Sequence, residues 1–215
     1  GTGLYLDSLL SGRTFAPFSP DGGLRARLEA RFDALGGEAM LGELAAADPE
    51  AAARLHPNDR KRIVRALEVF QQTGKTISQH NRETRALPLR YDALTLSLAF
   101  QRREDMWARI DRRVDEMMAA GLAEEVRALL DSGVPVRCTA MQAIGYKEMA
   151  AALRGGGDVC AAAEEIKLRS RQYAKRQLTW FRRTEGAKWL FWGPEPDFEA
   201  ACRTSTKYLE EFGLV

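Results

Sequence analysis

The stretch I-K-L-R-S-R-Q-Y-A-K-R-Q-L-T-W-F-R-R at residues 166–183 decides how the rest of this sequence is interpreted. It predicts one amphipathic helix, because at roughly 100° per residue its apolar side chains gather on one side. It contains seven basic residues and no acidic residue; Glu164 and Glu165 come just before it. Like charges without interleaved acids repel one another at a cost in stability. The positive face therefore favours a polyanionic partner, with a solvated helix face as the alternative.

The composition is that of a soluble globular protein, with 45% hydrophobic and 29% charged residues among 215. No apolar run approaches the roughly 20 residues needed to cross a bilayer, so no membrane partner is expected. No signal peptide is visible. Cys138, Cys160 and Cys202 are odd in number and lack C-x-x-C spacing, which favours reduced thiols and a cytoplasmic location. His56 and His80 have no metal-ligand pattern around them.

Residues 15–77 predict a compact set of helices. Asp21 is expected to cap a first helix, with apolar residues at spacings of four, four and three, that ends at Gly36-Gly37. Shorter helices are expected at 38–46 and from Asp48-Pro49 to Leu55. Asn58 is expected to cap the next helix, which ends at Thr73-Gly74 and buries Ile63, Ala66, Leu67 and Phe70. Ahead of this set, a helix is predicted that buries Leu4, Tyr5 and Leu9.

Gly74-Lys75-Thr76 resembles the end of a phosphate-binding loop, but that motif needs glycine five residues earlier, where the sequence has Val69. We interpret Gly74 as the residue that ends a helix.

Two strands and several helices are predicted after residue 77. A polar connector is expected at 78–90, and apolar residues at every second position predict a strand at 94–100. Residues 188–192 predict a second, buried strand. Helices are expected at 104–120, 122–130 and 198–212. Another is expected to begin at Thr139, which has a capping-box spacing with Gln142, and to run to Leu153.

Arg113 stands out on the helix at 104–120. It falls at the edge of the apolar stripe formed by Met106, Ile110, Val114 and Met117, whereas Arg109 and Arg112 are expected on the opposite face, paired with Asp105 and Glu116. A guanidinium that points inward needs an anion, because an unpaired buried charge is very costly. The alternatives are an arginine that extends to solvent or one paired with a core carboxylate.

Five segments together resemble the tRNA dimethylallyltransferase family: G-T-G-L-Y at 1–5, H-P-N-D-R-K-R-I-V-R-A-L-E-V-F at 56–70, T-G-K at 73–75, M-Q-A-I-G-Y-K-E at 141–148 and R-Q-Y-A-K-R-Q-L-T-W-F at 171–181. The resemblance implies a prenyltransferase that moves a dimethylallyl group from dimethylallyl diphosphate to N6 of the adenosine 3′-adjacent to the tRNA anticodon. It implies an α/β fold, predominantly helical here. Part of a P-loop-like parallel-sheet core is expected at 1–14 and 78–215, and a helical insertion that contacts the anticodon stem-loop at 15–77.

The resemblance also assigns roles to individual residues. Thr2 and Arg113 would be catalytic, with Thr2 near the acceptor amine. Arg113 and Arg171 would bind the substrate diphosphate. The tRNA-binding residues would be Arg60, Lys61, Arg62, Arg65, Arg137, Cys138, Gln142, Gly145, Tyr146, Lys147, Arg171, Lys175, Arg176 and Gln177.

The sequence departs from the family by lacking its upstream Gly-rich phosphate loop and its catalytic Asp. We therefore expect these 215 residues alone to be inactive, with no metal ligands among them. Mg²⁺ and nucleotide binding are implied for the family's upstream segment. A monomer is expected. The alternatives are a stand-alone, non-catalytic RNA-binding module and an enzyme that prenylates adenine nucleotides, although the basic insertion argues against the latter.

Overall fold

The computed structural model describes residues 3–12, 22–88 and 90–214, and its chain divides into two compact units. One unit comprises Gly1–Gly3 with Leu94–Val215, and the other comprises Leu4–Ala93. The division into 1–14, 15–77 and 78–215 stays a prediction. No helix of the described residues is long and apolar enough to cross a membrane.

The first unit contains two parallel strands, β1 (Leu96–Phe100) and β2 (Lys188–Trp192), with Leu96 opposite Lys188 and Phe100 opposite Trp192. Both predicted strands are confirmed, but the strand at 188–192 is not buried as predicted: of its residues only Leu190 is buried, and Phe191 is 61% exposed. The chain between them is helical, as parallel strands require: α6 (Arg103–Ala119), α7 (Leu122–Asp131), the 3-10 turn η1 (Ala140–Gln142), α8 (Tyr146–Gly155) and α9 (Val159–Phe181). The last helix, α10 (Phe198–Phe212), packs on β2, where the rings of Trp192 and Phe198 meet edge to face.

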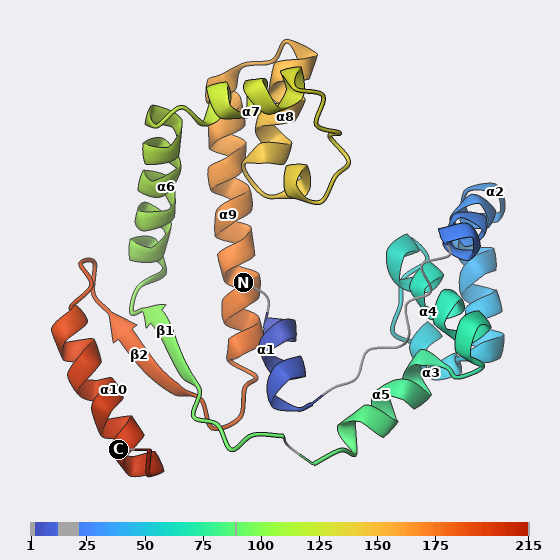
Figure 1. Cartoon of the computed structure of the whole chain (residues 1–215), viewed down its shortest axis with the longest axis horizontal. Coiled ribbons are helices and arrows are strands. Elements are labelled where there is room, and N and C mark those ends of the chain that lie inside the picture. The colour runs from blue at the N-terminus through green and yellow to red at the C-terminus, as the bar shows by residue number, and fades with distance from the viewer. Residues whose placement is uncertain (1–2, 13–21, 89, 215) are drawn as a thin grey trace. The chain divides into compact units, whose positions relative to one another are not determined.

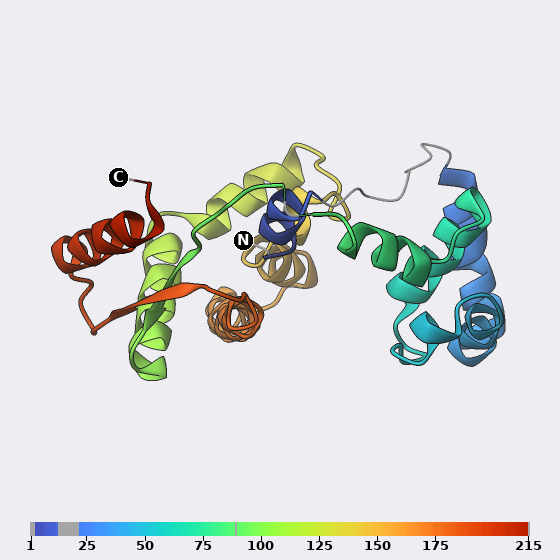
Figure 2. The ribbon, with the colours of Figure 1, turned by 90° about the horizontal axis from the view of Figure 1, so that it is seen from below.

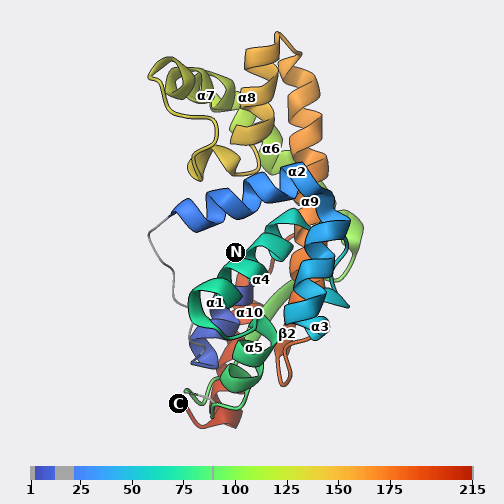
Figure 3. The same cartoon turned by 90° about the vertical axis from the view of Figure 1, so that its right-hand side faces the viewer.

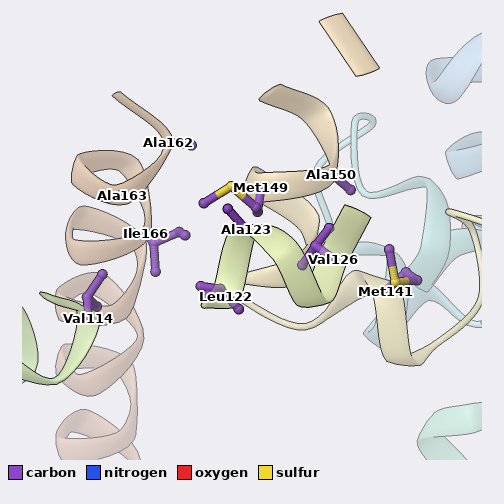
Figure 4. Close-up of a cluster of buried hydrophobic side chains, with 10 residues drawn as sticks. All are labelled: Val114, Leu122, Ala123, Val126, Met141, Met149, Ala150, Ala162, Ala163 and Ile166. Atoms are coloured by element: carbon purple, nitrogen blue, oxygen red, sulfur yellow. The ribbon is translucent and has the colours of Figure 1, made fainter. Parts of the chain in front are cut away.

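The core of this unit joins four helices. Helices α6 and α9 run side by side, with α7 and α8 packed at one end of α9 (Figure 1). The buried side chains that hold them together are aliphatic or methionine (Figure 4), namely Val114, Leu122, Ala123, Val126, Met141, Met149, Ala150, Ala162, Ala163 and Ile166. This cluster fixes α6 against the basic helix predicted at 166–183, which is confirmed up to Phe181, where α9 ends; Arg182 and Arg183 lie in the turn after it.

The prediction of a helix capped by Thr139 was wrong. Only a 3-10 turn follows Thr139, whose side chain makes no capping bond, and α8 begins at Tyr146. Gly145 has φ 105°, which L side chains rarely adopt, so it separates the two segments. Its N–H donates to the Glu148 carboxylate at 2.9 Å, which starts α8 instead.

The second unit contains helices and no strand in its described residues. The helices are α1 (Gly3–Leu10), whose first residue belongs to the first unit, α2 (Gly22–Ala47), α3 (Pro49–Ala52), α4 (Arg60–Thr73) and α5 (Ile77–Arg85). Gly36 has non-helical backbone angles, so α2 changes direction there (Figure 3), at the predicted boundary. Helix α4 packs on α2 and buries Ile63, Ala66 and Leu67 as predicted. Asp21 lies outside the described residues.

Three expectations for this unit were wrong. Leu4, Tyr5 and Leu9 of α1 are exposed rather than buried. Asn58 does not cap α4, which begins after Asp59. The connector predicted from residue 78 is mostly helix α5.

Local chemistry explains both ends of the Thr73–Ile77 turn. Gly74 is left-handed and ends α4, as interpreted from the sequence. Thr76 and Gln79 then form a reciprocal capping box that starts α5. Buried Asp48 ties α5 to α3, because its carboxylate accepts from the backbone N–H of Ala51 at 3.1 Å and of Ser78 at 3.0 Å.

Candidate functional site

A cavity of about 360 Å³ lies between α6 and α9 in the first unit. Its walls are mainly apolar and come from β1, α6, the segment before α8, and α9. The side chains that line it are Phe100, Met106, Arg109, Ile110, Arg113, Val114, Met117, Ile144, Ile166 and Ser170. Val114 and Ile166 also belong to the buried cluster (Figure 4), so one wall of the cavity is continuous with the core.

Two arginines line this cavity, although only Arg113 was expected to point toward the apolar stripe. Arg109 was placed on the opposite face, which was wrong, because residues four apart on a helix are neighbours on the same face. The pairing expected for Arg109 and Arg112 with Asp105 and Glu116 was also wrong. No ion pair joins these four residues within the described part of the chain.

The cavity therefore combines apolar walls with two guanidiniums that have no carboxylate partner among the described residues. Apolar side chains suit a short hydrocarbon group, and guanidiniums suit phosphate oxygens, to which they can donate two parallel hydrogen bonds. Such an arrangement stabilises negative charge that develops on a leaving group.

The first half of the basic stretch is neutralised by acids. Arg171 donates to Asp111 of α6 at 2.8 Å, and Arg169 donates to Glu165 at 2.6 Å. Lys167 contacts both Asp115 at 2.6 Å and Glu164 at 2.8 Å. The hydrogen bond with Asp115, followed by that with Glu164, raises the pKa of Lys167. The inference that the whole stretch is uncompensated was therefore wrong for these three cations.

The second half of the stretch keeps its positive charge. Lys175, Arg176, Arg182 and Arg183 are exposed and have no carboxylate partner in the part of the chain that the structure describes. Three of them line a hollow of about 400 Å³ together with Gln172, Thr179 and Trp180. Gln177 is half-buried nearby on the same helix. This surface suits an extended polyanion better than a small ligand, because its cations follow the end of α9 and the turn after it.

Gly3 lies directly against the Trp180 ring. A Cβ atom at Gly3 would be 2.1 Å from Trp180 Cδ1, so only glycine allows this approach. Gly3 and Trp180 both belong to the first unit, so this contact holds Gly3 against the positively charged end of α9. Thr2, which was predicted to be catalytic, lies outside the described residues.

The predicted tRNA-binding segment at 137–147 is a loop and turn rather than the start of a long helix. Arg137, Gln142 and Lys147 are exposed, Cys138 is half-buried, and Gln142 donates to the Val136 carbonyl at 2.8 Å. Tyr146 donates to Glu125 at 2.5 Å, and this bond raises the pKa of its phenol. Gly145 is buried and packs near Met117 of the cavity wall.

In the second unit, acids pair with most of the predicted basic patch. Arg60 contacts Asp33 at 2.8 Å, and Arg62 lies 3.7 Å from Asp59. Arg65 contacts Glu68 at 2.7 Å, and this glutamate side chain is only 3% exposed. Lys61 is exposed and has no acidic partner in the described residues. The first two pairs are open to solvent and weak, so Arg60 and Arg62 remain available to a phosphate.

A metal site is not indicated within the described ranges, where no three His, Cys, Asp or Glu side chains gather in a suitable group. The predicted Mg²⁺ stays a prediction.

Known proteins resemble this chain in sequence and in structure. The family model described as IPP transferase matches residues 1–184. The chain is 50% identical over 190 residues to tRNA dimethylallyltransferase 1 of Trichlorobacter lovleyi, covering 88% of this chain and 62% of that protein. It is 43% identical over 199 residues to tRNA dimethylallyltransferase of Bacillus subtilis, covering 93% and 62%. The chain thus spans about three-fifths of the length of these curated relatives.

Solved structures give the same assignment. A full-length tRNA isopentenylpyrophosphate transferase from Bacillus halodurans is similar with a TM-score of 0.63 and 34% identity, over 99% of this chain and 64% of that one. A eukaryotic dimethylallyltransferase acting on tRNA is similar with a TM-score of 0.72 and 26% identity, over 98% of this chain and 56% of that one. The family-model match and the curated identities together settle the assignment: this chain belongs to the IPP transferase family, whose named relatives are prenyltransferases.

Proposed function

We propose that this chain provides the leaving-group and tRNA-binding parts of a tRNA dimethylallyltransferase. The observation that carries the proposal is the cavity in which Arg109 and Arg113 lie beside Met106, Ile110 and Met117. Dimethylallyl diphosphate has a small branched hydrocarbon at one end and a highly charged diphosphate at the other, and the cavity offers matching groups to each.

The reaction proposed is a substitution at the allylic carbon. N6 of the adenosine forms a bond to that carbon, the bond from carbon to the diphosphate oxygen breaks, and its electron pair leaves with the diphosphate. Negative charge therefore builds on the leaving oxygens. Arg109 and Arg113 are placed to stabilise it, and preorganised donors of this kind act more strongly in the transition state than in the ground state. The N6 proton must pass to a base, and the resemblance implies the catalytic Asp of the family's upstream segment.

The tRNA is proposed to lie along the unpaired cations at the end of α9 and in the turn after it. Lys175, Arg176, Arg182 and Arg183 would contact phosphates, which position the RNA without reading its sequence. The exposed residues of 137–147 and Lys61, Arg60 and Arg62 of the second unit would extend these contacts. The acceptor adenosine must leave its stack for N6 to reach the allylic carbon.

Mg²⁺ remains our proposal for the accompanying cofactor, on the resemblance alone. When bound, it would neutralise part of the diphosphate charge. The described residues do not fit a Mg²⁺ site, so none is assigned to the ion and no step depends on it. We also propose that the protein is a monomer and that it is located in the cytoplasm.

The test uses the natural polypeptide that carries these residues, incubated with labelled dimethylallyl diphosphate, Mg²⁺ and unmodified tRNA. Label should enter the tRNA at the adenosine 3′ of the anticodon and should not enter adenosine monophosphate supplied as an alternative acceptor. Transfer to the mononucleotide alone would support the adenine-nucleotide alternative. Binding of tRNA without any transfer would support a non-catalytic RNA-binding module.

We also propose that residues 1–215 alone give no transfer, because they hold no Gly-rich phosphate loop. Turnover by this segment above background would contradict that proposal.

A further inference from the structure

Two ion pairs join α6 to α9 beside the cavity. Asp111 accepts from Arg171 at 2.8 Å, and Asp115 lies 2.6 Å from Lys167. The acids are four residues apart on α6 and the cations four apart on α9, so the pairs lie on successive turns of two helices that contact each other. Figure 2 views α9 nearly end-on, with α6 inclined beside it. The Lys167 side chain is 13% exposed and that of Asp115 is 61% exposed, whereas Arg171 and Asp111 are 29% and 30% exposed.

The two pairs lie on one flank of the contact between the helices, and the cavity arginines lie on the other. At about 100° per residue, Ile110 and Val114 form the middle of the face that α6 turns toward α9. Asp111 and Asp115 follow on one side of this middle, and Arg109 and Arg113 on the opposite side. Rotation of α6 about its own axis therefore moves the ion pairs and the arginines together.

We propose that Asp111 and Asp115 are positioning residues that fix the rotation of α6 and so direct Arg109 and Arg113 into the cavity. This inference rests on the proposed function. The apolar contacts of Ile110 and Val114 hold the helices together but do not fix this rotation, because hydrophobic contact is non-directional. Charge-assisted hydrogen bonds are directional and can fix it.

The expected size of the effect follows from helix geometry. A guanidinium lies about 6 Å from the helix axis, so a rotation of about 10° moves it by about 1 Å. A displacement of about 1 Å can cost on the order of 10² in rate. A small loss of rotational order in α6 is thus enough to impair both arginines.

The same contacts reassign Arg171, which was expected to bind diphosphate directly. Its guanidinium is held by Asp111 and lies 6.0 Å from the centre of the Trp107 ring. The other Asp111 oxygen is buried without a hydrogen-bond partner among the described residues. Loss of Arg171 would therefore leave a carboxylate with no compensating bond.

The experiment removes either the two acids or the two cations of the ion pairs in the natural polypeptide. Binding of inorganic diphosphate to each variant is measured by calorimetry. One double variant is Asp111→Asn with Asp115→Asn, and the other is Lys167→Gln with Arg171→Gln. Coulomb attraction alone predicts opposite results, because losing acids strengthens anion binding and losing cations weakens it. The positioning role predicts that both double variants bind diphosphate about tenfold or more weakly.

Matched controls are Glu116→Gln and Arg112→Gln, which change the charge of the same helix at exposed residues without an ion pair in the described chain. Each should change affinity less than threefold. Circular dichroism restricts the comparison to folded protein. In the transfer assay both double variants should show a lower kcat as well as a higher KM for dimethylallyl diphosphate.

Affinity equal to or greater than wild type in the Asp111→Asn, Asp115→Asn variant would overturn the positioning role. If that variant unfolds, Lys167→Asp alone and Lys167→Asp with Asp115→Lys decide instead. The single variant should weaken diphosphate binding and the reversed pair should restore it; failure of the reversed pair to restore binding refutes positioning. Unchanged binding by Arg113→Ala would overturn the diphosphate site itself.

Discussion

Replacing Arg113 by alanine should slow prenyl transfer far more than replacing its neighbour Arg112. Both residues are exposed arginines on α6, and neither has an acidic partner among the described residues. They differ in direction, because only Arg113 lines the cavity. The pair is therefore a matched comparison in which helix propensity and net charge are constant.

The magnitude follows from the role of the side chain. Loss of one preorganised donor to a developing negative charge typically costs about 10²–10³ in rate, or roughly 3–4 kcal/mol. Arg109 lies one turn away and remains, so the lower end of that range is expected for Arg113→Ala. Arg112→Ala removes an exposed side chain without an ion pair and should change stability by less than about 0.5 kcal/mol.

The assay is steady-state transfer of labelled dimethylallyl to tRNA by the natural polypeptide, with thermal unfolding of each variant. The rate is expressed per folded molecule. If Arg113→Ala lowers the melting temperature but leaves this rate intact, Arg113 is a structural residue and the cavity is not the leaving-group site. Equal losses for both variants would point to a general charge effect instead.

Three further predictions follow from the described contacts. Lys175→Glu with Arg182→Glu should weaken binding of all tRNAs about equally and reduce the salt dependence of binding, because each phosphate contact releases counterions. Titrations at several salt concentrations measure this, and an unchanged salt slope would count against these cations as the tRNA-binding surface. Asp48→Ala should cost about 1–3 kcal/mol in chemical denaturation, because the N–H groups of Ala51 and Ser78 lose their buried acceptor. Burial raises the pKa of Asp48, but the hydrogen bonds from Ser78 and Ala51 outweigh it and lower the pKa below 3.8. The stability advantage of wild type over Asp48→Ala should therefore be full above pH 3.8 and shrink as the pH falls through the pKa of the folded state. A stability advantage that grows toward acid pH would contradict the lowered pKa.

Sequence patterns predicted elements whose stability is local. Strand β2 and helix α10 have the predicted bounds, because a short run of consecutive apolar residues marks the first and a strong helical period marks the second. Helix α5 was missed because it is polar, and its stability comes from the Thr76 cap and from Asp48, which is distant in sequence. Tertiary contacts of this kind leave no local pattern.

The candidate site was predicted in part for the same reason. The position of Arg113 beside an apolar stripe was visible from helical spacing, and the same spacing applied to Arg109 would have placed it in the cavity too. The partners of the basic stretch were not visible, because Asp111 is 60 residues from Arg171 and the helix period says nothing about which helix lies opposite.

The parallel pairing of β1 with β2 has a consequence for the order of folding. The two strands meet only after α6 to α9 have folded back between them, so pairing requires closure of a long loop whose entropy cost grows with its length. A two-stranded sheet gains too little by itself to offset that cost. The ladder should therefore form late and open first, and deuterium uptake at its amides should measure the integrity of the whole helical segment that it closes.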